Sequence, residues 1–216
     1  INVSIDRSPV TYYVSNSGND DTGNGSQDNP FKTIKKAIDQ GFAVSIYPTI
    51  MIMEGTYKGV GNTNLSFSDL GILNIIGVYN KTIIDGEFIG AGFKFGSYIQ
   101  SNIINMTFIN CSPIDSFGAA AIYASGFANI TNCIFKNNSR QTVLYMDGGS
   151  NVINSTFIDN NVTSLYMRGG LIENSSFINN NATSGIAGMP GSFSSYNFTV
   201  RNSMFINNTL TSSSTT

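Results

Sequence analysis

Three short segments place a tyrosine between apolar residues and form the best candidate for a binding surface. They are IYA (122–124), LYM (144–146) and LYM (165–167), with Tyr123, Tyr145 and Tyr166 at their centres. If the flanking residues enter a core, the alternation of side chains along a strand turns the tyrosines outward. Asp147 and Arg168 each follow a tyrosine by two residues, so we expect them to pair across neighbouring strands. Together these five residues are the predicted binding site.

Two interpretations of the tyrosine segments stay open. Aromatic rings suit the C–H face of a saccharide, which predicts a sugar-binding strip on one face of a sheet. Stacked aromatic side chains also shield and stabilise a sheet, by about 0.5–1.5 kcal/mol per pair. The few charges around the strip favour a neutral glycan or a protein partner over a polyanion.

Composition excludes several other kinds of chemistry. The chain has no histidine, which rules out Ser-His-Asp and Cys-His catalysis and imidazole-bound zinc. Only 11% of the residues are charged and the net charge is −2, so a surface that tracks nucleic-acid phosphates is not expected. No run of apolar residues approaches the ~18 needed to span a membrane. The two cysteines, Cys111 and Cys133, occupy different repeat positions, so a disulfide between them is doubtful.

An acidic loop near the N-terminus is the one candidate metal site. The segment NSGNDDTGNGSQD (16–28) is dense in oxygen ligands, and Asp20 and Asp21 are its best candidates for binding Ca²⁺. The loop lacks the ligand spacing of an EF-hand. A turn held by the side chains of Asp and Asn explains the same composition without a metal. No other cofactor is expected.

One eight-residue pattern recurs five times. It reads Ile/Val, any, Asn, any, any, Phe, any, Asn/Asp, and its first residue is Val or Ile in every case. The matches are IINMTFIN (103–110), ITNCIFKN (130–137), VINSTFID (152–159), IENSSFIN (172–179) and VRNSMFIN (200–207). A period of 20 to 28 residues, too short for helical repeats, predicts a solenoid of stacked β-coils.

The pattern also assigns a role to its fixed residues. The phenylalanines should stack inside the core; they are Phe108, Phe135, Phe157, Phe177 and Phe205. The asparagines three residues earlier should form the bend between two strands and stack there as a buried, hydrogen-bonded ladder; they are Asn105, Asn132, Asn154, Asn174 and Asn202. Fourteen Asn-x-Ser/Thr sequons hint at secretion. Burial predicts no glycosylation at those of Asn105, Asn154 and Asn174.

A helix is expected before the coils. Asn29 can cap it, Pro30 suits its first turn and Gly41 can end it, so we predict a helix over 29–41 that covers the open end of the solenoid. The β-like segments 49–57, 73–78 and 82–87 are expected to form the first, less regular coils. The prediction is a single domain over 1–210, with five regular repeats in 103–208. Residues 211–216 read as a linker, and the chain as a segment of a longer protein.

The sequence resembles a known group of β-helix proteins. YYVSNSGNDDTGNGSQDNPFKTIKKAID (12–39) is similar to the entry segment of secreted right-handed parallel β-helix proteins of the pectate-lyase-like superfamily, and MEGTY with IIGVYNKTIIDGE to their first coils. The Phe-x-x-Asn of four repeats and GAAAI (118–122) resemble the repeats of polymorphic membrane proteins. The Asn-rich whole looks most like adhesin-like surface proteins of gut methanogenic archaea. Cys111 departs from the pattern, since Asn is expected there.

The resemblance implies an all-β right-handed parallel β-helix with a short N-terminal capping helix. Lyases of this fold hold Ca²⁺ in an acidic cluster and use Lys or Arg as base, whereas the charges of the repeats are scattered. These charges are Asp115, Asp147, Asp159, Glu173, Arg140, Arg168 and Arg201. We therefore expect a non-enzymatic, extracellular, adhesin-like protein that binds glycans or partner-cell molecules. A polysaccharide lyase or hydrolase and a purely structural stalk are the alternatives.

Overall fold

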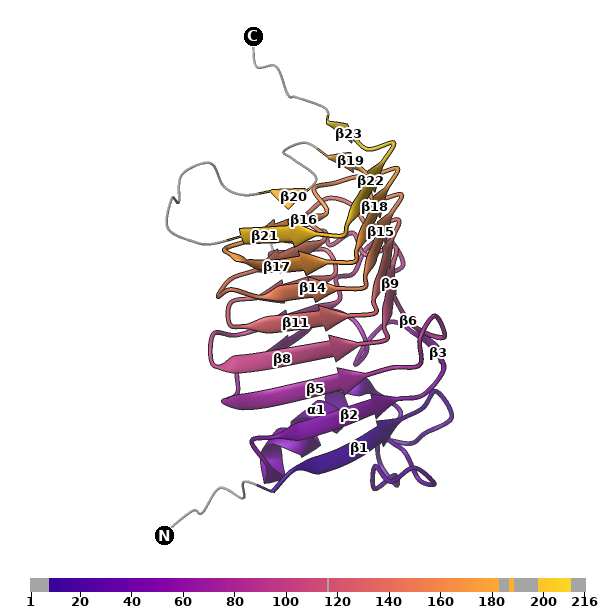
Figure 1. Ribbon diagram of the computed structural model, residues 1–216. Helices are drawn as coiled ribbons and strands as arrows, with labels where there is room; N and C mark the ends of the chain where they lie inside the picture. The colour runs from indigo at the N-terminus through magenta and orange to yellow at the C-terminus, as the bar shows by residue number, and fades with distance from the viewer. Residues whose placement is uncertain (1–7, 116, 183–186, 189–197, 211–216) are drawn as a thin grey trace.

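The molecule is a stack of coils along one axis, with the N-terminal coil at the bottom of Figure 1 and the C-terminal coil at the top. The computed structural model describes residues 8–115, 117–182, 187–188 and 198–210. All of the strand pairs are parallel, and successive coils contribute to the same three sheets. The predicted all-β parallel β-helix is confirmed.

Three long sheets form the faces of the solenoid. The eight-stranded sheet contains β1 (Val10–Val14), β2 (Pro48–Ile52), β5 (Gly71–Ile76), β8 (Ile99–Ile104), β11 (Ala128–Thr131), β14 (Asn151–Ile153), β17 (Gly170–Glu173) and β21 (Phe198–Arg201). The seven-stranded sheet contains β3 (Gly55–Tyr57), β6 (Thr82–Asp85), β9 (Thr107–Ile109), β12 (Ile134–Lys136), β15 (Thr156–Ile158), β18 (Ser176–Ile178) and β22 (Met204–Ile206). The six-stranded sheet contains β4 (Leu65–Phe67), β7 (Phe93–Phe95), β10 (Ile122–Ala124), β13 (Leu144–Met146), β16 (Leu165–Met167) and β20 (Ala187–Gly188). A short pair, β19 (Asn181–Ala182) and β23 (Thr209–Leu210), lies near the C-terminal end.

The repeated phenylalanines stack in register through the core. Phe108, Phe135, Phe157 and Phe177 are fully buried, and successive rings along this series lie 5.4, 4.8 and 4.7 Å apart. Phe205 continues the stack at 4.8 Å but is 46% exposed, because it belongs to the last described coil. In-register parallel pairing sets this spacing, since identical side chains repeat at the distance between strands. The repeat thus supplies one core ring per coil.

The predicted bend exists, but its asparagines are not buried. All five of the residues Asn105, Asn132, Asn154, Asn174 and Asn202 have positive φ, between 50° and 60°. Each turns the chain from the eight-stranded to the seven-stranded sheet, a conformation that asparagine tolerates. Asn154, Asn174 and Asn202 are nevertheless exposed, and the others are half-buried. The prediction of a buried ladder at these positions is wrong, because the left-handed turn directs these side chains away from the core. The reason for predicting no glycosylation at these sequons is lost with it.

The buried ladder lies at a different repeat position, three residues after each phenylalanine. Asn138, Asn160 and Asn180 are at most 1% exposed. The Oδ1 of Asn160 accepts hydrogen bonds from the backbone N–H and the Nδ2 of Asn138, and its own Nδ2 donates to the carbonyl of Phe135. Asn180 repeats this arrangement one coil further on. Cys111 occupies the same position in the first repeat, where its N–H donates to the Oδ1 of Asn138.

The helix covers the N-terminal end of the core, as predicted, but with different bounds. Helix α1 (Ile34–Val44) starts after Thr33, whose side chain accepts a hydrogen bond from the N–H of Lys36. Asn29 belongs instead to a turn, since its N–H donates to the carbonyl of Ser26. Gly41 lies inside the helix and does not end it. The helix packs closely on Pro48 at this point, which favours glycine, since a Cβ here would come within 2.7 Å of the proline ring.

Two remaining features are the state of the cysteines and the character of the helix. Cys111 and Cys133 are both buried and free. Burial raises the pKa of each thiol to about 12, which leaves them unreactive. Among the residues that the structure describes, no helix has the length and apolar character of a membrane span.

Candidate functional site

The three tyrosines lie in one outward-facing row on the six-stranded sheet. Strand register pairs Tyr123 with Tyr145 and Tyr145 with Tyr166. The residues that flank each tyrosine are buried, whereas the tyrosines themselves are half-buried. The alternation predicted from the sequence therefore holds for all three strands. Whether the row binds a ligand stays a prediction.

The rings of the row stack face to face. Tyr123 and Tyr145 have centroids 4.8 Å apart and planes 9° apart, and Tyr145 and Tyr166 have centroids 4.4 Å apart and planes 7° apart. Because both faces of the Tyr145 ring are covered by its neighbours, a sugar cannot stack on it as the sequence suggested. What this part of the row presents to a ligand is ring edges and hydroxyl groups. In the strand register the next neighbour of Tyr166 is Gly188, which has no side chain to continue the stack.

A polar network joins the hydroxyl ends of the row to an ion pair. The Nε of Arg168 lies 3.3 Å from the Oδ1 of Asp147, as the sequence predicted for neighbouring coils. The side chain of Arg168 also interacts with the hydroxyl of Tyr166, which interacts in turn with that of Tyr145. Burial, with the nearby carboxylate of Asp147 second, raises the pKa of Tyr145 to about 12. Tyr145 therefore remains a neutral hydrogen-bonding group at any physiological pH.

A lysine that the sequence did not single out extends the row. Strand register places Lys94 next to Tyr123, and Ser66 next to Lys94. The Nζ of Lys94 lies 5.0 Å from the centroid of the Tyr123 ring, a cation–π contact. Lys94 forms no ion pair with any residue in the described part of the chain. The signal that could have revealed it is FKF (93–95), which has the same apolar–polar–apolar form as IYA and LYM.

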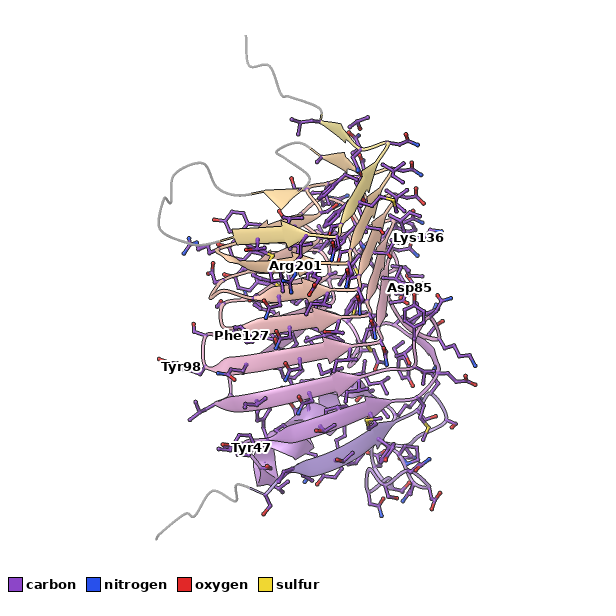
Figure 2. All side chains as sticks on the ribbon, in the orientation of Figure 1. Tyr47, Asp85, Tyr98, Phe127, Lys136 and Arg201 are labelled. Atoms are coloured by element: carbon purple, nitrogen blue, oxygen red, sulfur yellow. The ribbon has the colours of Figure 1, made fainter. Side chains whose placement is uncertain are left out.

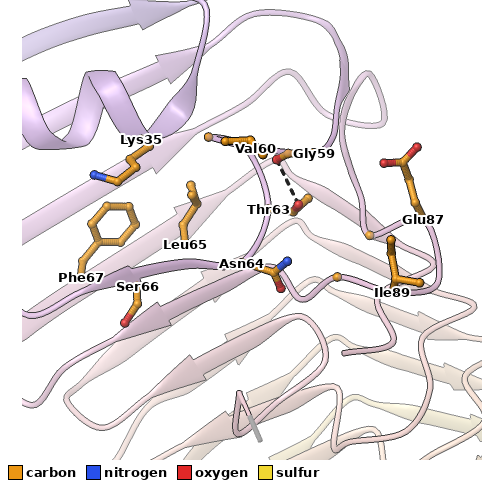
Figure 3. A pocket seen from close by; sticks show the side chains of 13 residues that line it. Lys35, Gly59, Val60, Thr63, Asn64, Leu65, Ser66, Phe67, Glu87 and Ile89 are labelled. Carbon is orange, nitrogen blue, oxygen red and sulfur yellow. Dashed lines mark hydrogen bonds between the residues drawn. The ribbon is translucent and has the colours of Figure 1, made fainter. Parts of the chain in front are cut away.

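A pocket of about 410 Å³ opens beside the N-terminal end of this row. Ser66 belongs to both, because it lies in the row and lines the pocket. Figure 3 shows Lys35 and Phe67 at one side of the pocket and Glu87 and Ile89 at the other. Strand β4 is the last strand of its sheet at this end, so the pocket lies between the free edge of the sheet and the start of α1. The outer face thus offers a pocket followed by a row of polar and aromatic side chains.

The acidic loop is built as a hydrogen-bonded turn. One oxygen of Asp20 accepts hydrogen bonds from the N–H groups of Lys32 and Thr33, and the other accepts one from the Thr33 hydroxyl. Burial alone would raise the pKa of Asp20, but these hydrogen bonds outweigh it and hold the pKa below its usual value. Asp21 is exposed. Across the residues that the structure describes, no group of three or more acidic, cysteine or histidine side chains is arranged to hold a metal ion. The turn interpretation explains Asp20 fully.

The overall structure is similar to solved structures of polysaccharide-modifying enzymes. A pectin methylesterase from Aspergillus niger superimposes with a TM-score of 0.59 at 15% sequence identity, over 91% of this chain. The fold is shared with pectin methylesterases. The enzyme from Erwinia chrysanthemi gives a TM-score of 0.53 at 16% identity, and a pectin methylesterase variant in complex with a hexasaccharide gives 0.54 at 18%, each over 90% of this chain. The matches cover 65–66% of those proteins, so this chain spans just under two thirds of their length. No protein-family model matches the chain, and no curated protein matches its sequence.

These similarities correct one expectation drawn from the sequence. The scattered charges of the repeats led to the prediction of a non-enzymatic protein, yet the similar solved structures are those of enzymes, pectin methylesterases. Scattered charges were a poor criterion, because residues far apart in sequence meet on one face of a solenoid. Asp147 and Arg168, from consecutive coils, are such a case. Of the resemblance drawn from the sequence, the parallel β-helix fold is confirmed, because this chain shares it with pectin methylesterases.

Proposed function

We propose that the protein binds a polysaccharide along the outer face of the six-stranded sheet and acts on it there. The observation that carries the proposal is the polar network of Tyr145, Tyr166, Arg168 and Asp147, set in an outward row on an otherwise apolar set of strands. Such a row runs across the strands and suits a long polymer. The similar fold of pectin methylesterases, one of them in complex with a hexasaccharide, supports this function over adhesion alone. An extracellular location is part of the proposal.

The charge of the row favours an acidic polysaccharide. Asp147 and Arg168 balance each other, so Lys94 leaves the row with one excess positive charge. A uronate carboxylate near Lys94 would meet a cation that has no other acidic partner in the described residues. This differs from the neutral glycan expected from the sequence, because that expectation did not include Lys94.

In the proposed reaction, Asp147 is the group that accepts a proton or attacks the substrate. It directly follows β13, and none of the six strands of the sheet contains an acidic residue within its bounds. Arg168 holds this carboxylate in place from the neighbouring coil. The hydroxyl of Tyr145, with its pKa raised to about 12, stays protonated and can donate a hydrogen bond to a developing negative charge. These roles fit a hydrolase or a lyase that acts on a uronic acid polymer.

The test uses methyl-esterified and unesterified polygalacturonate. Ester hydrolysis is followed by acid release, chain hydrolysis by new reducing ends and elimination by the ultraviolet absorbance of unsaturated products. We expect turnover in one of the three assays, reduced at least about 100-fold in Asp147→Asn, since general base catalysis typically contributes that much. Asp159→Asn is the matched control: Asp159 is exposed on the seven-stranded side and should leave activity unchanged. Absence of both binding and turnover would overturn the proposal.

Adhesion is the second candidate function. The Asn-rich repeats resemble those of adhesin-like surface proteins, and the tyrosine row lies on the outer face of a sheet, where a partner molecule has access. The same experiment separates the two functions. Binding of a polysaccharide at the row, with no product in any of the three assays, would favour adhesion.

A further inference from the structure

A second surface with binding chemistry lies at the corner where the eight-stranded sheet turns into the seven-stranded sheet. A shallow groove of about 350 Å³ is lined there by Tyr79, Asn105, Asn132 and Asn154. Its asparagines come from three successive coils, and Tyr79 comes from the coil before them. By the strand spacing, these four residues extend roughly 14 Å along the axis. The groove lies on a different side of the solenoid from the tyrosine row.

The side-chain amides in this groove make few hydrogen bonds within the protein. On the outer face of the eight-stranded sheet, the Nδ2 atoms of Asn102, Asn129 and Asn151 each donate to the asparagine of the preceding coil at 2.8–2.9 Å. In the groove, the one such bond, from Asn132 to Asn105, is 3.3 Å long. The side chain of Asn154 has no hydrogen-bond partner among the described residues. The groove therefore presents donors and acceptors that a ligand can satisfy.

The backbone holds these amides in a fixed row. Asn105, Asn132 and Asn154 adopt the left-handed conformation, with φ of 60°, 54° and 52°. Each is bonded to the next coil, since the N–H of Asn105 donates to Thr131 and that of Asn132 to Ile153. A ligand that binds here meets side chains whose backbone is already ordered, which lowers the entropy cost of binding.

Tyr79 forms the aromatic end of the groove. It lies in a bend that is longer than the later ones, between β5 and β6, and the N–H of Gly77 anchors this bend to the carbonyl of Ile104 in the next coil. Tyr79 is 56% exposed. Unlike the tyrosines of the six-stranded sheet, it makes no ring contact with another aromatic residue in the described part of the chain. Its ring is thus available for packing against a ligand.

The geometry points to a binding site for a neutral oligosaccharide. A carboxamide both donates and accepts, which matches pairs of adjacent sugar hydroxyls, and an aromatic ring packs on the C–H face of a sugar. None of the four lining residues is charged. An anionic ligand would lose hydration here without meeting a counter-ion. This site is independent of the proposed function, whose ligand is acidic and lies on another sheet.

The experiment is a titration of the ¹⁵N-labelled protein with neutral hexasaccharides, namely cello-, xylo- and mannohexaose, and with hexagalacturonate for comparison. With at least one neutral sugar, we expect the side-chain amide signals of Asn132 and Asn154 to shift. Tyr79→Ala should weaken this binding about 2- to 12-fold, the usual worth of one aromatic contact. Asn154→Gly keeps the left-handed turn, removes the amide and should weaken binding as well.

Three control variants make the test specific: two match the residue types changed in the groove, and one alters the tyrosine row. Tyr98→Ala removes a tyrosine that is 73% exposed just before β8, on the side of the eight-stranded sheet opposite the groove (Figure 2), and should leave binding unchanged. Asn137→Gly changes an exposed asparagine with φ of 56° on the far side of the seven-stranded sheet, and should also have no effect. Tyr145→Ala should retain binding, which separates this site from the tyrosine row. No shift with any neutral hexasaccharide, or equal losses in Tyr79→Ala and Tyr98→Ala, would overturn the proposal.

Discussion

Asparagine side chains occupy two kinds of repeat position in this chain, and burial separates their roles. Three residues before each core phenylalanine, asparagine supplies a left-handed bend and its amide reaches solvent, as at Asn154. Three residues after it, asparagine is buried and bonds to the coils on both sides, as at Asn160. Both positions favour asparagine, but for different physical reasons. Backbone conformation selects it at the first and hydrogen bonding at the second.

Asn160→Ala should lower the free energy of unfolding by about 1–3 kcal/mol. It leaves the buried N–H of Asn138 without its acceptor and removes one of the two acceptors of its Nδ2, the other being the carbonyl of Phe108; an unsatisfied buried group costs about 1–3 kcal/mol. Asn154→Gly is the control, since glycine keeps the left-handed turn and the side chain is exposed; it should cost less than about 1 kcal/mol. Denaturant unfolding of both variants measures this. Equal losses would refute the assignment of the buried ladder.

Tyr145 should ionise far above the ordinary range for tyrosine. Burial and the carboxylate of Asp147 raise its pKa from 10.0 to about 12. Because the folded-state pKa is raised, its contribution to stability is complete below pH 10 and is lost as the pH rises from 10 to about 12. The difference between alkaline absorbance titrations of the wild type and Tyr145→Phe isolates this phenol. A midpoint near 10 would contradict the network described for the site.

The sequence revealed the row of tyrosines but not how the rings would lie. Alternation within IYA and LYM was enough to predict which side chains point outward, because that depends on the strand alone. The covered ring faces depend on parallel, in-register pairing at about 4.8 Å, which brings identical rings into contact. Lys94 was missed because its segment, FKF, carries no tyrosine and so does not match the others by residue type.

At the scale of elements, the loop before α1 and the helix start are joined through Asp20. Its carboxylate binds the N–H groups of Lys32 and Thr33 and the Thr33 hydroxyl, and Thr33 in turn caps the helix. The cap was predicted at Asn29 because Asn-Pro is a common helix start. Phe31 instead forms a bridge with Val14, which keeps residues before Thr33 out of the helix. Val14 and Phe31 are far apart in sequence, so no local sequence pattern predicts this contact.

Asp20→Asn should destabilise the protein by about 1–2 kcal/mol at neutral pH, because a charged acceptor of three hydrogen bonds becomes a neutral one that is partly screened by solvent. The folded-state pKa of Asp20 is lowered, so its stabilising effect is present above the unfolded-state pKa and is lost as the pH falls through the folded-state value. Unfolding curves of both proteins between pH 7 and 2 should therefore converge in acid. A difference that is independent of pH would refute the role of the carboxylate.

The phenylalanine stack makes each coil depend on its neighbours. Phe157 is fully buried between Phe135 and Phe177, so Phe157→Ala should cost about 3–5 kcal/mol. Phe205→Ala should cost about half as much, since that ring is 46% exposed and contacts one neighbour of the stack. Thermal or denaturant unfolding gives both values. A larger loss at Phe205 than at Phe157 would contradict the described order of the stack.

At the scale of the whole molecule, regular stacking explains what the sequence could and could not predict. The recurring pattern defines one coil, and the stacking of similar coils then determines the core and the sheets. The architecture could therefore be predicted from the repeat. Binding surfaces depend on side chains contributed by different coils, such as Asp147 with Arg168 or Tyr79 with Asn105. Their proximity is set by loop lengths, which differ between coils. The same stacking makes surfaces that run along the axis, as an extended polysaccharide requires.

The most direct test of the proposed function is an NMR titration of protein labelled with ¹³C in its tyrosine rings. The chain has ten tyrosines, so the rings of the row and those elsewhere report in one experiment. With esterified or unesterified oligogalacturonate, we expect the ring signals of Tyr123, Tyr145 and Tyr166 to shift together, while that of the exposed Tyr98 stays unchanged. Binding that leaves these three signals in place, or no binding by either form of the oligosaccharide, would contradict the assignment of this face as the polysaccharide site.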